Sequence, residues 1–119
     1  MPTVSETAGL NPAWHYGLVL LEAGFYWEAH EVLEPVWMNA AEDSAERHLV
    51  QAVIQLANGA LKIAMGRPKA AERLFDMVRD LLAKAGPGPV MGLDPWQVVQ
   101  SIAAIDPEVD PQGIRIGEA

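Results

Sequence analysis

The chain has 119 residues, of which 50% are hydrophobic and 20% are charged, a balance typical of one globular domain and not of a disordered segment. It contains no cysteine, which excludes disulfide bonds, catalytic thiols and zinc sites built on thiolates. A net charge of -8 provides no basic surface for nucleic acid or anionic lipid, so we expect neither partner.

We also expect no targeting or membrane segment. The first ten residues lack the basic and apolar regions of a signal peptide. The most apolar stretch, residues 49–65, is interrupted by glutamine, asparagine and lysine, which argues against a transmembrane helix. With the absence of cysteine, these features predict a cytoplasmic protein.

The first two expected helices are recognised from the residues at their ends. Asn11 before Pro12 is typical of a helix start, and Gly24 is typical of a helix end. A second helix is expected over about residues 26–40, because its apolar positions recur at helical spacing. Pro35 lies inside this pattern and is expected to kink the helix without ending it.

Three further helices follow. Asp43 with Glu46 three residues later predicts a capping box that opens a third helix, which ends near Gly66. Pro68 starts a fourth helix with a continuous apolar stripe, and the glycine and proline residues at 86–89 end it. Residues 94–95, Asp and Pro, open a short fifth helix that ends before residue 107.

These elements predict an all-α fold, a helical bundle of two helical hairpins plus a C-terminal capping helix. A weak internal repeat with an offset of 42 residues supports the pairing into hairpins. Gly24, Ala29 and Leu33 correspond in it to Gly66, Ala71 and Phe75. The expected organisation is an irregular N-terminal segment over residues 1–10, a single helical domain over 11–106 and an irregular tail over 107–119.

Polar side chains form one stripe on the second helix and another on the third. His30, Glu34 and Trp37 follow the spacing i, i+4, i+7 and therefore share a face. Gln51 and Gln55 lie one turn apart on a helix that is otherwise apolar and so largely buried. Buried amides need partners, so we expect the two stripes to meet. The candidates for a ligand-binding site or polar network are Glu28, His30, Glu31, Glu34, Trp37, Gln51 and Gln55.

Four interpretations of this meeting remain open. The first is a structural network that fixes helix register, and the second is a pocket for a small molecule. The third is a metal site on His30, Glu31 and Glu34, although the zincin and di-iron spacings are both absent. The fourth is a catalytic site with His30 as general base oriented by Glu34. No catalytic residue can be assigned, and no motif for an organic cofactor is present.

The same residues resemble a known family. Ala-His-Glu-x-x-Glu-x-x-Trp at residues 29–37, Gln-x-x-x-Gln at 51–55 and the turn from Gly66 are similar to the pattern of domain-of-unknown-function family 309. The chain departs from that pattern in the turn, at Arg67 and Ala70. The resemblance implies a small all-helical bacterial or archaeal protein of the cytoplasm. It marks as signature residues His30, Glu31, Glu34, Trp37, Gln51 and Gln55, and it implies no reaction.

For function, the sequence favours a non-enzymatic binding or scaffold module with a polar cleft or network between the second and third helices. The alternative is a metal-assisted or acid-base hydrolase that uses His30 and the neighbouring glutamates. A small molecule, another protein and a second copy of the chain all remain open as partners.

Overall fold

The computed structural model describes residues 11–109 and 111–114. Within those residues the chain forms five helices and no strand. The helices are α2 (Pro12–Ala23), α3 (Tyr26–Asn39), α4 (Ala45–Ala64), α5 (Pro68–Ala85) and α6 (Pro95–Ala103). The predicted all-α bundle is therefore confirmed. The predicted irregular segment at residues 1–10, and residues 110 and 115–119 of the predicted tail, lie outside the described residues.

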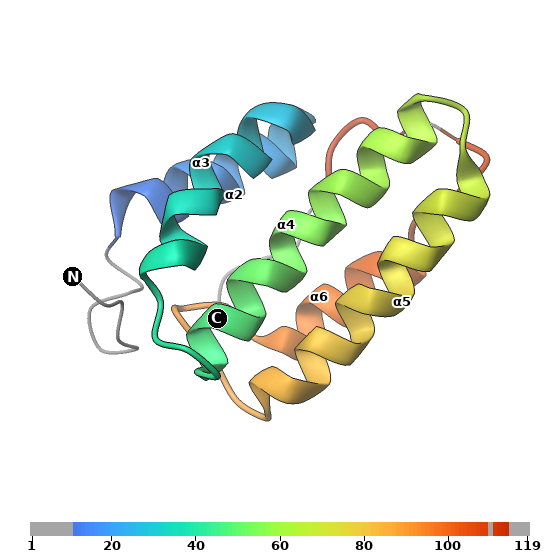
Figure 1. Ribbon diagram of the computed structural model, residues 1–119. Coiled ribbons are helices and arrows are strands. Elements are labelled where there is room, and N and C mark those ends of the chain that lie inside the picture. Colours follow the sequence, from blue (N-terminus) through green and yellow to red (C-terminus); the bar gives the residue numbers. More distant parts are fainter. Residues whose placement is uncertain (1–10, 110, 115–119) are drawn as a thin grey trace.

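Helix α4 occupies the middle of the bundle. It has α3 on one side and α5 on the other, while α2 packs against α3 and α6 packs against α5 (Figure 1). This central position explains why α4 buries apolar side chains around most of its circumference. None of the helices among the described residues is long and apolar enough to cross a membrane.

The ends of the first two helices agree with their sequence signals. The Oδ1 atom of Asn11 accepts hydrogen bonds from the backbone N–H groups of Ala13, at 2.9 Å, and Trp14, at 3.3 Å. Gly24 has φ +89°, the left-handed conformation that ends many helices and that glycine adopts without strain. Pro35 lies inside α3, which continues to Asn39, so the prediction that it does not end the helix is confirmed.

The predicted start of α4 is wrong by one residue. Ser44, and not Asp43, is the N-cap, because its Oγ accepts a hydrogen bond from the backbone N–H of Arg47 at 3.1 Å. Asp43 has φ +59° and belongs to the preceding turn. A serine and an aspartate are almost equally good N-caps, so sequence preference alone did not separate the two neighbours.

The two long helix pairs repeat the same close contact. Gly17 of α2 lies against the side chain of Leu33 on α3, and Gly59 of α4 lies against the ring of Phe75 on α5. Both residues of the first contact precede their counterparts by 42 positions, which is the offset of the internal repeat found in the sequence. The internal repeat therefore includes an equivalent packing contact in each helix pair, in addition to the matching single residues.

Three longer-range hydrogen bonds attach the loop before α6 and the end of the described chain to the first helices. The indole N–H of Trp14, which is fully buried, donates to the carbonyl of Met91 at 2.9 Å. The Tyr26 hydroxyl donates to the carbonyl of Pro111 at 2.9 Å, and the backbone N–H of Ile114 donates to the carbonyl of Leu21 at 3.2 Å. Both segments are thereby held on the side of α2 and α3.

Candidate functional site

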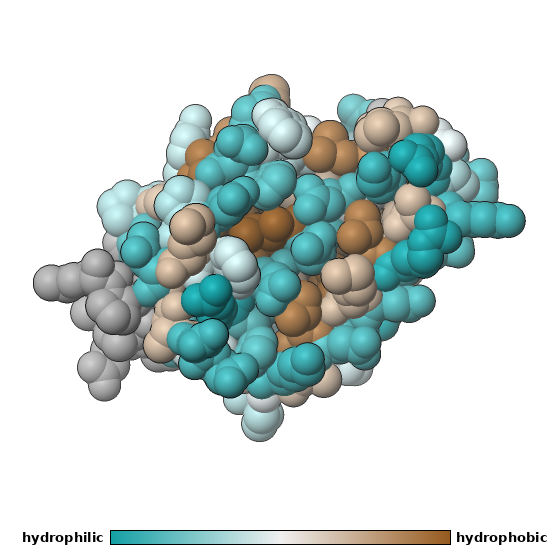
Figure 2. All heavy atoms as spheres, viewed as in Figure 1, coloured by the Kyte–Doolittle hydropathy of each residue, from teal (hydrophilic) through white to brown (hydrophobic). Residues whose placement is uncertain are grey.

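A cavity of about 140 Å³ lies between α3 and α4. Its walls combine polar, aromatic and apolar side chains: His30, Glu34, Trp37, Gln51, Ile54 and Gln55. The face of the molecule seen in Figure 2 shows small hydrophobic patches set among hydrophilic residues. The helix spacing that placed one polar stripe on each helix thus brings both stripes to the wall of a single cavity.

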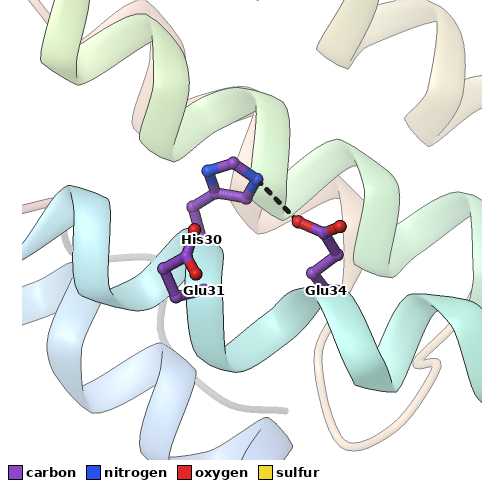
Figure 3. A group of neighbouring side chains, drawn as sticks. All are labelled: His30, Glu31 and Glu34. Atoms are coloured by element: carbon purple, nitrogen blue, oxygen red, sulfur yellow. Dashed lines mark ion pairs between the residues drawn. The ribbon is translucent and has the colours of Figure 1, made fainter.

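His30 and Glu34 point from α3 towards α4 (Figure 3). The Nε2 atom of His30 lies 3.2 Å from Oε2 of Glu34, one helical turn away. The His30 side chain is 22% exposed and that of Glu34 is 51% exposed, so the pair spans the boundary between the cavity and solvent. The ring of Trp27 meets the imidazole edge to face, with centroids 5.6 Å apart and planes at 88°, and restricts its orientation.

Two residues of this cavity wall each carry a buried polar atom without a partner. These atoms are Nδ1 of His30 and the indole Nε1 of Trp37. Among the described residues a third such atom, Oε1 of Gln97, belongs to α6 and not to the cavity wall. Leaving a buried donor or acceptor unpaired costs about 1–3 kcal/mol for each group. A concentration of two such atoms at one small cavity therefore calls for an explanation.

The glutamines do not complete the expected network. Gln51 and Gln55 are half-buried and line the cavity, but Oε1 of Gln55 accepts a hydrogen bond from Asn58 on its own helix, at 3.2 Å. Within the described residues, no hydrogen bond joins either amide to His30 or Glu34. The two stripes meet around an open space instead of satisfying each other.

The other acidic candidates lie outside the cavity wall. Glu31 is exposed beside His30, and one ligand atom each from His30, Glu31 and Glu34 lie within 4.8 Å of one another. Glu28 is exposed in the first turn of α3 and belongs to neither the cavity wall nor this cluster.

Two features of the site were not identified from the sequence. Arg47 stacks on Trp37, with its guanidinium carbon 4.3 Å from the ring centroid, while its Nη1 donates to the carbonyl of Ala40 at 3.1 Å. Ile54 supplies the apolar part of the cavity wall. Its position, three residues after Gln51 and one before Gln55, places it beside both amides on the helical surface, and that spacing was the available signal.

The internal repeat provides a second site for comparison. Advancing His30, Glu34 and Trp37 by 42 positions gives Glu72, Asp76 and Arg79, and these residues line another hollow, next to Ile102 of α6. There the polar groups pair with each other, since Arg79 Nη1 donates to Asp76 Oδ1 at 2.9 Å. The unpaired atoms are thus specific to the first site and are not a requirement of the repeated packing.

Comparison with known proteins gives one match. The family model described as "Domain of unknown function (DUF309)" matches residues 14–74, a range that contains every candidate residue of the site. No curated protein and no solved structure matches the chain.

Proposed function

The chain belongs to the DUF309 family, and we propose that it is a non-enzymatic binding module whose cavity between α3 and α4 takes a small polar ligand. The observation that carries this proposal is that two residues of one cavity wall, His30 and Trp37, each have a buried polar atom without a partner. A ligand that bonds to both atoms removes a cost of about 1–3 kcal/mol at each.

The two atoms indicate what kind of ligand fits. The indole N–H of Trp37 is a donor only, so it needs an acceptor. The Glu34 carboxylate 3.2 Å from His30 Nε2 favours a proton on that nitrogen, which leaves Nδ1 of the neutral ring as an acceptor. A neutral amide group offers both an acceptor and a donor. Its size also agrees, because a cavity of about 150 Å³ holds a molecule of roughly six heavy atoms, such as benzene.

A binding site is supported better than a purely structural network. A network would require the amides of Gln51 and Gln55 to satisfy His30, whereas the amide of Gln55 is bonded to Asn58. Acid-base or metal-assisted hydrolysis by His30 and Glu34 is the alternative function of the same cavity wall.

Titration with acetamide, followed by NMR of the four indole N–H signals, tests the proposal. The Trp37 signal is assigned by its loss in Trp37→Phe. We expect acetamide to shift that signal in a saturable manner in protein treated with a chelator, while the signal of the exposed Trp96 does not move.

The matched control comes from the hollow on α5 that corresponds to this cavity in the internal repeat. Gln51→Leu keeps the size of the side chain but removes a polar group from the cavity wall, and it is expected to weaken acetamide binding. Asp76→Asn changes the corresponding hollow on α5 and is expected to leave binding unchanged. If acetamide shifts no indole signal, or shifts that of Trp96 equally, the proposal is wrong.

A further inference from the structure

We propose that the outer face of α2 is a dimer interface, on which a second copy of the same chain packs its own α2 in the antiparallel direction. The inference is independent of the proposed ligand, because none of the residues of this face lines the cavity between α3 and α4. It assigns to the chain an interaction surface and the partner that covers it.

The outer face of α2 is built from apolar residues. Pro12, Tyr16, Val19 and Ala23 follow the spacing i, i+4, i+7, i+11 and form one stripe, and all four are exposed. Tyr16 is 57% exposed and Val19 is 61% exposed. The helix contains one acidic residue, Glu22, which lies about 120° around the helix from Tyr16. The solvent-facing stripe of α2 therefore carries no charge.

The turn after α2 extends this surface. The backbone N–H groups of Gly24 and Phe25 donate to the carbonyls of Leu21, at 3.2 Å, and Leu20, at 2.9 Å, which is the Schellman arrangement. This motif brings residue 25 beside residue 20, and Phe25 is 52% exposed while Leu20 is half-buried. We call the following residues together the α2 face: Pro12, Tyr16, Val19, Leu20, Ala23 and Phe25.

Helix α5 shows how differently a solvent-facing surface of the same bundle is built. It exposes charged side chains along its whole length: Lys69, Glu72, Arg73, Asp76, Arg79, Asp80 and Lys84. A surface helix is expected to place such residues on its outer side. A contiguous exposed apolar surface, as on α2, instead marks a site of interaction.

The internal repeat indicates what the α2 face lacks. At the offset of 42 residues, Pro12 and Val19 correspond to Ile54 and Leu61 of α4. Ile54 is buried and lines the cavity opposite α3, and Leu61 is half-buried, whereas both counterparts on α2 are exposed. Among the described helices, α3 is the one that packs extensively on α2, through Gly17 on another side of the helix (Figure 1). The position that α3 occupies on α4 is thus open on α2, and stacked helical repeats need a neighbour or a polar cap at such an end.

The size of the α2 face agrees with a dimer of ordinary size. Each partner in such a dimer buries about 800 Å², of which about 57% is apolar, or roughly 450 Å². A fully covered aromatic side chain buries about 150–250 Å², so the exposed fractions of Tyr16 and Phe25 supply about 160–270 Å². The four aliphatic residues of the face extend this area towards the amount that a dimer requires.

Charge and shape favour a second copy of the chain as the partner. Two chains of net charge -8 repel each other, so they associate best through a surface that brings no like charges into contact. In an antiparallel pairing with the two-fold axis level with residues 17–18, Tyr16 packs against the smaller Val19 of the partner subunit. Pro12 then lies near Ala23 of the partner subunit, and each contact occurs twice, as a two-fold interface requires.

Sedimentation velocity of the full chain, from micromolar to submillimolar concentration, tests the dimer. We expect a concentration-dependent dimer, and Val19→Glu should raise its dissociation constant at least about tenfold, because it buries a like charge on each side of the axis. Met77→Glu adds the same charge at an apolar residue of α5 that is 45% exposed, and it should leave the dimer unchanged. Circular dichroism checks the fold of both variants. A monomer at every concentration, or equal weakening by the two variants, would overturn the proposal.

Salt separates an apolar interface from one built on ion pairs. NaCl screens the repulsion between two acidic chains and leaves apolar contacts intact, so the dissociation constant should fall as the NaCl concentration rises. A dimer that weakens with added salt would place the contact on charged surfaces such as that of α5, and the α2 face would not be the interface.

Single cysteines locate the contact, since the chain contains none of its own. In the antiparallel pairing the two copies of residue 19 are offset by about 4.5 Å along the helix, and those of residue 23 by about 16 Å. A disulfide needs Cα atoms closer than about 7 Å. Under mild oxidation we expect Val19→Cys to form a covalent dimer, and Ala23→Cys and Met77→Cys to stay uncrosslinked. Equally fast crosslinking of Ala23→Cys would contradict the antiparallel pairing, and of Met77→Cys the interface itself.

Discussion

Gly59 of α4 lies so close to the ring of Phe75 on α5 that a methyl group at position 59 would overlap the ring. Gly17 and Leu33 make the corresponding contact between α2 and α3. Glycine is a poor helix former, less favourable than alanine by about 0.8–1.0 kcal/mol. Its presence inside two helices is explained by the close approach of the neighbouring side chains, which brings α2 against α3 and α4 against α5.

We therefore expect Gly59→Ala to lower the free energy of unfolding by about 1–3 kcal/mol, because forcing a methyl group into a packed contact costs more than the gain in helix propensity. Gly17→Ala should have a similar effect through Leu33. Urea denaturation of each variant, monitored by circular dichroism at 222 nm, measures the change.

The double variant Gly17→Ala with Leu33→Ala provides the control. Leu33→Ala alone should destabilise the protein by about 2–5 kcal/mol, since the side chain is fully buried. In that background the added methyl group has space, so Gly17→Ala should be neutral or stabilising by up to about 1 kcal/mol. An equal loss in both backgrounds would show that steric overlap with Leu33 is not the cause.

The N-cap of α4 gives a second prediction. Ser44→Ala removes the acceptor of the Arg47 backbone N–H and should cost about 1 kcal/mol, whereas Ser44→Asp retains an acceptor and should stay within about 0.5 kcal/mol. Thermal and urea denaturation of the two variants test this difference. A neutral Ser44→Ala would mean that Asp43 caps the helix after all.

Most helix boundaries could be predicted because their signals are local. Asn11 with Pro12, the left-handed Gly24 and Pro68 each act on the backbone within a few residues of their position. The start of α4 was misplaced because Asp43 and Ser44 are adjacent and chemically similar as caps, and only the φ of +59° at Asp43 separates them.

The candidate site was predictable only in part, since helical spacing determines which residues share a face but not how far apart two faces lie. The stripes of α3 and α4 were identified, and both line the cavity. The open space between them, the unpaired Nδ1 of His30 and the stacking of Arg47 on Trp37 depend on side-chain conformations across two helices. No periodicity in one sequence contains that information.

The buried tryptophan of the core gives a third prediction. Trp14→Phe removes the indole N–H that donates to Met91 and leaves that carbonyl buried without its partner. Loss of this bond should cost about 1–3 kcal/mol, in addition to the cost of the smaller ring. Equilibrium unfolding in urea measures the loss, and a change below about 1 kcal/mol would contradict the importance of this contact.

The same substitution at Trp37 should behave differently, because Trp37→Phe removes a buried donor that has no partner in the protein. The gain from eliminating an unsatisfied group, about 1–3 kcal/mol, opposes the loss of ring area and a weaker stack with Arg47. We expect the free energy of unfolding to change by less than about 1 kcal/mol, clearly less than in Trp14→Phe.

Ligand binding should show the opposite order. Trp14→Phe leaves the cavity wall unchanged and should retain the binding of acetamide, whereas Trp37→Phe lacks one of the two groups proposed to hold it. Saturation-transfer NMR, which observes the acetamide and not the indole, compares the two variants. A residue that is neutral for folding but necessary for binding is expected where a polar atom is kept for a ligand. If Trp37→Phe instead destabilises the protein as much as Trp14→Phe and retains acetamide binding, Trp37 serves the packing of α3 on α4 and not a ligand.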